Sequence, residues 1–296
     1  MEDLSTTTLP LVLGTAEWKR REQAHHARVD RLLSAHLARR RAGEAHPVED
    51  FLFSYYSFRP SALRRWNPGP GVLLEGHPEQ DPPRGYVVQS DRVGLDPSYA
   101  VSRHERIRWV RDLLTATAAR APSFGCLGLH EWAMVYRQRR DDLRHAAWPL
   151  RLGSHGTDAV VESHRIACTH FDAFRFFTAP ARPRNAVEPA RDLQQELEQP
   201  GCLHVGMDLY KWAYKLAPMT PSDLVADCFE LARDIRELDM RASPYDLTGL
   251  GYTPVRIETV EGKQRYAAEQ RSFTSRAAPL RQRLVTVCDA LLDIRT

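Results

Sequence analysis

The chain has 296 residues, of which 43% are hydrophobic, and this is enough to bury a sizeable core. Charged residues make up 27% of the chain with a formal net charge of +3, so a nucleic-acid partner is neither required nor excluded. The five cysteines are widely spaced and odd in number, which disfavours a disulfide framework or a zinc ribbon. The N-terminus does not resemble a signal peptide, and no stretch approaches the ~18 apolar residues of a membrane-spanning helix. We therefore expect a cytoplasmic protein without a membrane partner.

The first third of the chain predicts a long helix followed by a small sheet. Apolar residues recur at helical spacing over residues 16–42, and Gly43 ends the pattern. Two short β-like runs, Val72–Glu75 and Tyr86–Gln89, lie in a segment dense in Pro and Gly and predict a hairpin or small sheet. A second amphipathic helix is expected over 103–119.

The central segments are less regular. A glycine-punctuated turn at 125–128 leads into a short predicted helix, His130–Tyr136. Residues Ala159–Thr169 could form a strand or a helix, and the β-branched residues favour a strand. Residues 178–201 predict a loop rich in Pro and Arg that encloses a short helix over 190–198.

The last third predicts mainly helices. One covers 205–216, and another begins at Thr220-Pro221-Ser222-Asp223, with Thr220 as the cap, and continues to about Arg241. A strand is expected at 253–260. The last helix, 263–292, should kink or break at Pro279. The whole predicts an α+β fold, mainly α-helical with a small β-sheet, as a single domain over 1–296 with 98–103 as the alternative boundary.

Histidines and carboxylates gather in the central quarter of the sequence. The histidines of this cluster are His130, His145, His155, His164, His170 and His204, and the nearby acids are Glu131, Asp158, Glu162, Asp172 and Asp208. Imidazole titrates near neutral pH and is the commonest metal ligand. On a strand, Glu162 and His164 would share a face, as would His170 and Asp172. This stretch is therefore the predicted functional site.

Three interpretations of the cluster remain open. A zinc, iron or manganese site would draw its ligands from His130, His164, His170 and His204 together with the nearby acids. Alternatively, the histidines donate to backbone carbonyls in a polar core, or they serve as general acids and bases. His130 and Glu131 begin like the H-E-x-x-H zinc motif, but Met134 stands where its second histidine is required.

Two aromatic segments have cations nearby. In 207–215, Tyr210 and Tyr214 share one helical face while Lys211 and Lys215 share the next, which suits a stacked base and its phosphate. A helix that buries its aromatic rings and exposes its lysines gives the same pattern. Residues 51–66 hold aromatic side chains followed by arginines, and they predict either a nucleic-acid platform or core packing.

The helix that ends near Arg241 carries an acidic stripe beside its apolar stripe. The acids are Asp223, Asp227, Glu230, Asp234 and Glu237. Because like charges repel, a cationic partner should cover them, which could be arginines of this chain, a metal ion or another chain, and we expect the arginines. The chain lacks the P-loop, the dinucleotide-binding glycine pattern and the G-x-S-x-G turn of serine hydrolases.

Several runs of the chain resemble a bacterial family of about this length that is labelled 3-methyladenine DNA glycosylase. They are HPVEDFLFSYYSFRP (46–60), FGCLGLHEWAMVYR (124–137), HAAWPLRLG (145–153), GTDAVVESHRIACTHFDAFRFF (156–177), GCLHVGMDLYKWAYKL (201–216) and DCFELARDIRELDMRASPYDL (227–247). The Leu247–Gly251 turn is similar to that of helix–hairpin–helix glycosylases, but Pro254 and an expected strand stand where that family has a helix. The chain shares no motif with the β-rich alkyladenine glycosylases.

The resemblance implies a DNA-repair enzyme that releases alkylated purines from damaged DNA without a cofactor. Such a base is a good leaving group, so the enzyme needs a pocket for the flipped base and one carboxylate that directs water. Asp172 is the leading candidate, with Glu131 and Asp208 in reserve. The candidate substrate-binding residues are Trp132, Tyr136, Phe174, Tyr210, Tyr214, Lys211 and Lys215.

Two other functions fit the same residues. One is a metal-dependent hydrolase or oxygenase built on the histidine cluster, with a divalent cofactor. The other is a non-enzymatic protein that binds nucleic acid through residues 51–66.

Overall fold

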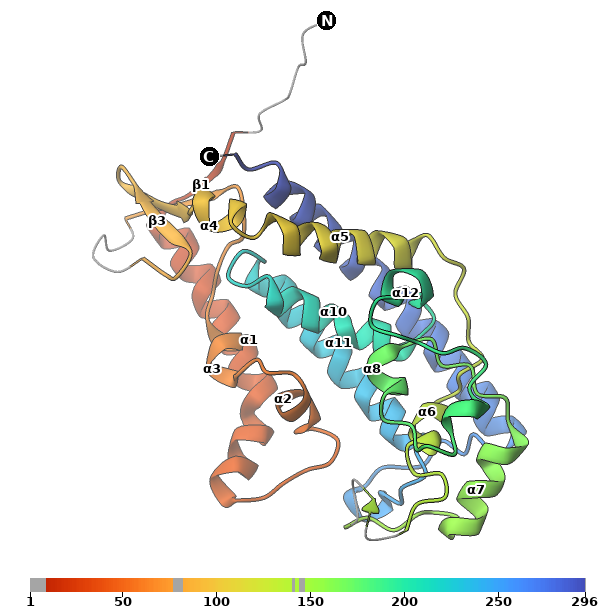
Figure 1. The fold of residues 1–296 in the computed structure, drawn as a ribbon. Helices are drawn as coiled ribbons and strands as arrows, with labels where there is room; N and C mark the ends of the chain where they lie inside the picture. The colour runs from red at the N-terminus through yellow and green to blue at the C-terminus, as the bar shows by residue number, and fades with distance from the viewer. Residues whose placement is uncertain (1–8, 77–81, 140–141, 144–146, 296) are drawn as a thin grey trace, which may run out of the picture.

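The computed structural model describes residues 9–76, 82–139, 142–143 and 147–295. Helices dominate it, and a single mixed sheet of four strands lies at one end (Figure 1). The predicted α+β class, mainly helical with a small sheet, is confirmed.

The elements span a wide range of lengths. The strands are β1 (Leu11–Leu13), β2 (Val72–Glu75), β3 (Tyr86–Gln89) and β4 (Arg92–Leu95). The long helices are α1 (Thr15–Ala42), α5 (His104–Ala118), α7 (Gly153–Ser163), α10 (Leu203–Lys215), α11 (Ser222–Arg241) and α12 (Val260–Leu292). The short helices are α2 (Phe51–Tyr55), α3 (Pro60–Arg64), α4 (Pro97–Val101), α6 (Leu129–Ala133), α8 (Phe171–Phe174) and α9 (Gln194–Leu197).

The sheet has the order β1-β2-β4-β3, with β1 parallel to β2 and the other neighbours antiparallel. The strands predicted at Val72–Glu75 and Tyr86–Gln89 are β2 and β3, and the predicted bounds of both are confirmed. Strands β1 and β4 were not predicted. The start of α1 is fixed to the sheet because the indole of Trp18 donates to the carbonyl of Glu75 at 2.9 Å.

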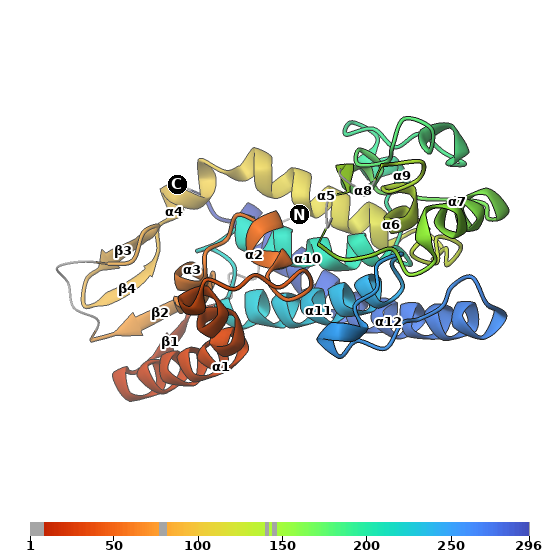
Figure 2. The same ribbon diagram turned by 90° about the horizontal axis from the view of Figure 1, so that it is seen from below.

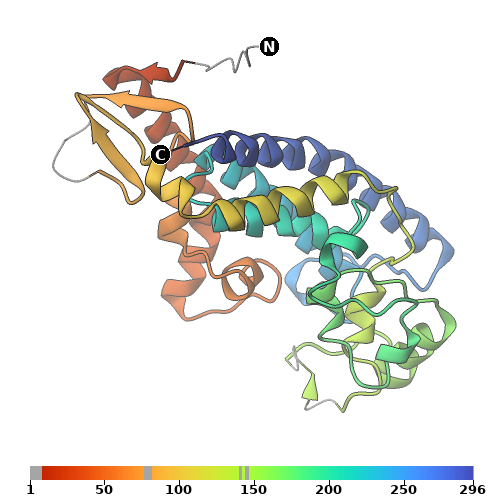
Figure 3. The ribbon, with the colours of Figure 1, turned by 45° about the horizontal axis from the view of Figure 1, so that its top comes forward.

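Helices α10 and α11 run side by side through the middle of the molecule (Figure 2). Helix α12 packs against both of them and against α5, which lies along α12 (Figure 3). The largest cluster of buried apolar side chains extends from Val29 to Leu291 and includes Ala100, beside the alternative domain boundary. Gly206 lets α10 approach α11 closely, because a Cβ there would lie 2.9 Å from Ile235.

The predicted strand at 159–169 is wrong. Residues up to Ser163 belong to α7, and the chain then runs extended with one isolated bridge between Ile166 and Asn185. The β-branched Val160 and Val161 pack into the core from this helix. Burial of these side chains therefore outweighs their weak intrinsic preference for strands.

The expectations for the last third are partly wrong. Residues 253–260 form no strand, since Val255 donates to the carbonyl of Arg241 and a turn follows before α12 begins. Helix α12 does not end at Pro279, because its packing along the bundle offsets the one lost backbone hydrogen bond. Helix α11 begins at Ser222 with Pro221 as its cap, and the Thr220 side chain is buried instead of capping.

The other helical predictions are confirmed to within a few residues. The predicted helices at 16–42, 103–119 and 205–216 correspond to α1, α5 and α10. The loop at 178–201 is largely irregular, and its helix is shorter than predicted, at Gln194–Leu197.

Arginines cover the acidic stripe of α11, as expected. Arg28 of α1 binds both Asp227 and Glu230, at 2.7 and 3.0 Å. Arg276 and Arg283 of α12 reach Asp234 and Asp227, each at 2.6 Å. The stripe therefore connects α11 to helices on both sides of it. Across the described ranges, each helix is too short or too polar to cross a membrane.

The tight start of α12 gives a stability prediction. A Cβ on Gly262 would lie 1.8 Å from the carbonyl oxygen of Arg256, whereas one on Gly249 meets nothing within 4 Å. We expect Gly262→Ala to lower the free energy of unfolding by about 3 kcal/mol, because the backbone must move to relieve the overlap. Gly249→Ala should cost less than about 1 kcal/mol. Urea unfolding measures the stability of both variants. An equal loss of unfolding free energy in Gly262→Ala and Gly249→Ala would contradict the close packing at Gly262.

Candidate metal centre

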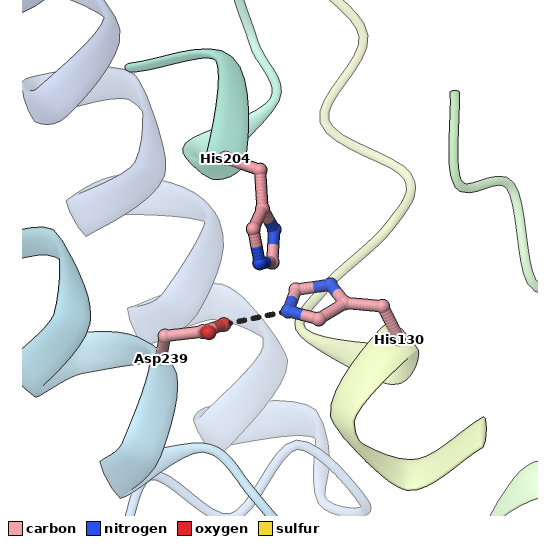
Figure 4. Close-up of side chains that lie close together, drawn as sticks. All are labelled: His130, His204 and Asp239. Atoms are coloured by element: carbon pink, nitrogen blue, oxygen red, sulfur yellow. Dashed lines mark hydrogen bonds and ion pairs between the residues drawn. The ribbon is translucent and has the colours of Figure 1, made fainter. Parts of the chain in front are cut away.

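Three buried side chains from distant parts of the chain meet between α6, α10 and α11. His130 extends from α6, His204 from the first turn of α10 and Asp239 from the end of α11, and all three point toward one another (Figure 4). The Nε2 atom of His130 lies 2.8 Å from Oδ1 of Asp239. One ligand atom from each of the three residues lies within 4.8 Å of the other two. We call these residues the first trio.

A second trio lies next to the first. It consists of His170, which precedes α8, Glu198, which follows α9, and Asp208, one helical turn beyond His204 on α10. Nε2 of His170 is 3.1 Å from Asp208 and 3.7 Å from Glu198. The His204 ring connects the trios, because its centroid is 4.4 Å from that of His130 and 5.3 Å from that of His170.

The protonation states of the two histidines in the first trio differ. Burial lowers the pKa of His130, but the Asp239 carboxylate and the Cys126 sulfur outweigh it, and the pKa lies well above its usual value. Burial and the neighbouring His130 hold the pKa of His204 well below its usual value. His204 is therefore a neutral imidazole at physiological pH, the form that binds metals.

The first trio has unused hydrogen-bonding capacity. Oδ2 of Asp239 is buried and has no hydrogen-bond partner, although the Arg236 guanidinium lies 3.5 Å from it. Buried polar atoms in native proteins are nearly always satisfied, so this carboxylate oxygen indicates a missing partner.

The second trio is already neutralised. The Lys211 ammonium contacts Oδ2 of Asp208 directly and lies 3.1 Å from Asp172. The Tyr56 hydroxyl donates to Oδ1 of Asp208 at 2.9 Å. Burial would raise the pKa of Asp208, but Lys211 and His170 outweigh it and hold the pKa well below its usual value. A lysine thus occupies the side of this trio where a cation would bind.

A small cavity opens beside the first trio. It encloses about 30 Å³, and its walls include Tyr55, Glu131, Asp172, Phe176, His204 and Arg236. That volume holds a water molecule or an ion but not a purine base. Glu131 is buried against Arg236, with an oxygen–nitrogen distance of 3.0 Å. We call this space the central cavity.

The structure brings together most of the predicted acids and half of the six predicted histidines. Glu131 and Asp172 line the central cavity, and Asp208 lies one turn from His204. His164 belongs to neither trio, and its Nδ1 lies 2.7 Å from the carbonyl oxygen of Val160. The strand that would have paired His164 with Glu162 is helical. His155 is exposed on α7, and His145 lies outside the described residues.

The predicted substrate-binding residues divide into two groups. Trp132, Tyr136, Phe174 and Tyr210 are buried, and they pack in the core. Lys211 and Tyr214 line a second hollow of about 390 Å³, and the exposed Lys215 lies at its edge. Of the two lysines on this helix, only Lys215 is exposed, because Lys211 is buried beside Asp208 and Asp172.

The aromatic segment 51–66 packs mainly against the core. Phe51, Leu52 and Tyr56 are buried, and the Phe58 ring stacks on Tyr214 with centroids 4.9 Å apart. Arg64 pairs with Asp30 of α1 at 2.7 Å. Core packing is thus the interpretation that these contacts favour over a platform for nucleic acid.

Sequence reasoning missed Asp239, Glu198, Arg236 and Cys126. Asp239 had a signal, because it follows Ile235 by four residues on the apolar stripe of α11, where a carboxylate is out of place. Glu198 lies in an irregular loop without periodicity, and no pattern indicates its burial. Cys126 lies at the turn before α6, with its sulfur 3.3 Å from Nδ1 of His130.

Comparison of the chain with family models, characterised proteins and solved structures finds no match.

The buried Asp208 gives a prediction for the pH dependence of stability. Its folded-state pKa is depressed, so the unfolded chain binds the proton more tightly, and the stabilisation is present above the unfolded pKa of about 4. We expect the wild type to lose stability relative to Asp208→Asn as pH falls below 4, by up to about 1.4 kcal/mol per pH unit. Chemical unfolding between pH 6 and 2 measures this difference. A difference that does not change with pH would contradict the assignment.

Proposed function

We propose that this protein is a metal-dependent enzyme, and that one divalent ion binds to His130, His204 and Asp239. The observation that carries the proposal is the convergence of two buried imidazoles and a buried carboxylate, with Oδ2 of Asp239 unsatisfied and His204 in the wall of a cavity. Two histidines and one carboxylate form a common ligand set for zinc and for non-haem iron. Such ligands bind at about 2.0–2.2 Å, and the three ligand atoms here already lie within 4.8 Å of one another.

The first trio is favoured over the second as the metal site because a lysine ammonium already neutralises the second trio. Asp239 has Arg236 near one oxygen, and the proton that it shares with His130 can be displaced by a metal ion. Asp208 instead holds the ammonium of Lys211, whose pKa is raised despite burial because Asp208 and Asp172 favour its charged form. A second metal ion would have to displace that lysine.

The surroundings suit a metal that activates water. A bound metal lowers the pKa of its water ligand to about 7. Glu131 and Asp172 line the same cavity, so either carboxylate is placed to take up a proton. The contact between Nδ1 of His130 and Cys126 can fix the orientation of the ring, as metal-binding histidines commonly require. These features favour a hydrolase.

Metal binding tests the proposal directly. We expect untagged wild-type protein to contain about one zinc, iron or manganese ion per chain by elemental analysis. His204→Gln and Asp239→Asn should each lower metal affinity at least about 100-fold, because each removes one of three ligands. Calorimetric titration of chelated and dialysed protein measures these affinities.

The exposed His155 supplies the matched control. His155→Gln removes an imidazole from the same part of the sequence but from the surface of α7, and metal binding should not change. Circular dichroism shows whether each variant folds. The proposal fails if folded wild type binds none of the three metals, or if His204→Gln binds them as His155→Gln does.

A second candidate is the N-glycosylase activity implied by the resemblance. The observation that favours it is the position of Asp172, which is partly exposed and lines both the central cavity and the adjoining hollow beside Phe176. A flipped base would have to enlarge the central cavity, and Asp172 would have to leave Lys211 and Arg175, which lie 3.1 and 3.3 Å away. The metal site requires smaller changes.

Release of free base from alkylated duplex DNA tests this candidate. We expect Asp172→Asn to reduce release at least about 100-fold if the Asp172 carboxylate directs the attacking water. Asp91→Asn, which changes an exposed aspartate in the turn between β3 and β4, is the control. Normal release by Asp172→Asn would exclude Asp172 from this chemistry.

A further inference from the structure

A large open groove lies on the surface between α5, α10 and the segment before α9. It has a volume of about 830 Å³, and its walls include Arg106, Trp109, Arg191, Asp192, Trp212 and Lys215. We call it the cationic groove. Its size is that of a site for a small molecule.

The groove lies next to the central cavity in a row of three spaces. Lys215 lines both the cationic groove and the adjoining hollow of about 390 Å³. Tyr55, Asp172 and Phe176 line both that hollow and the central cavity. The three spaces are therefore neighbours, from the surface groove to the cavity that His204 lines.

Three cations in the groove lack an acidic partner. Arg106, Arg191 and Lys215 are exposed, and in the part of the chain that the structure describes none of them forms an ion pair. Arg28, Arg276 and Arg283, by contrast, pair with the acidic stripe of α11. Partial burial and the nearby Lys211 lower the pKa of Lys215, and Arg106 contributes in the same direction. Convergence of like charges costs free energy unless an anion offsets it.

Aromatic surface accompanies this charge. The Trp109 side chain is 38% exposed and packs against Trp212 with ring centroids 5.2 Å apart. Phe176, on the way to the central cavity, is 37% exposed. The exposed part of the Trp109 ring provides a stacking face for a planar ligand.

We infer that the cationic groove binds the anionic end of a small aromatic substrate, a phosphate or carboxylate, and directs the rest of the molecule toward the metal site. This inference rests on the proposed function for the reaction, but the binding step does not require metal. Asp192 in the groove and Asp172 beyond it disfavour a nucleic-acid strand, because a chain of phosphates would have to pass both carboxylates.

Binding of three naphthalene probes to metal-free protein tests the inference. 1-Naphthyl phosphate and 1-naphthoate should bind, and 1-naphthol should bind at least about 10-fold more weakly because it lacks the charge. Equilibrium dialysis measures the affinities. Since this assay contains no metal, failure of the proposed metal site leaves its result unchanged.

Variants of α5 and its neighbours locate the site. The double variant Arg106→Gln and Arg191→Gln should weaken binding of both anionic probes about 10-fold or more. Arg108→Gln also removes one positive charge from α5. Arg108 follows Arg106 by two residues and so lies about 200° around the helix axis from it, on the face away from the groove, and this variant should retain binding. Trp109→Leu should weaken all three probes through loss of stacking.

Three results would overturn the inference. The first is equal affinity for naphthol and the two anions. The second is a double variant that binds as Arg108→Gln does. The third is tighter binding of a ten-nucleotide single strand than of either anion, with affinity falling steeply with salt, which would indicate a nucleic-acid surface instead.

Discussion

Neutralisation of buried charge is the constraint on which the centre of this protein depends. Helices α10 and α11 carry Asp208 and Asp239 into a core where an uncompensated carboxylate is strongly unfavourable. Lys211 and His170 compensate the first, and His130 compensates the second. The irregular segments that carry His130 and His170 are therefore fixed to the bundle by charge as well as by apolar packing.

The two trios show how one additional side chain changes what a site can hold. Both contain imidazole and carboxylate, and both are buried along the same face of α10. Lys211 lies one turn from Asp208 and contacts it directly. The arginine beside Asp239, Arg236, instead lies 3.5 Å from it and pairs more closely with Glu131. Neutral His204 between them limits repulsion among the three imidazoles.

The sequence predicted the fold where local patterns and tertiary packing agree. The amphipathic α1, α5 and α10 bury the faces that their periodicity indicates, so their positions were correct. Residues 159–169 were assigned incorrectly because the packing of Val160 and Val161 overrides their preference for strands. In the site, the one-turn spacing of His204 and Asp208 was readable from the sequence. The pairing of His130 with Asp239 was not, because 109 residues separate them and spacing carries no information over such a distance.

That separation affects how the molecule assembles during synthesis. The polypeptide leaves the ribosome from its N-terminus, so His130 is exposed well before residue 239 has been made. Until residue 239 has been synthesised, the His130 imidazole and the neighbouring Cys126 thiol are without their buried partner. Both side chains are then accessible to metal ions and oxidants in solution. Closure of a loop this long has a large entropic cost and delays formation of non-local contacts. The part of the chain that carries the two trios should therefore mature late, after the N-terminal sheet has formed.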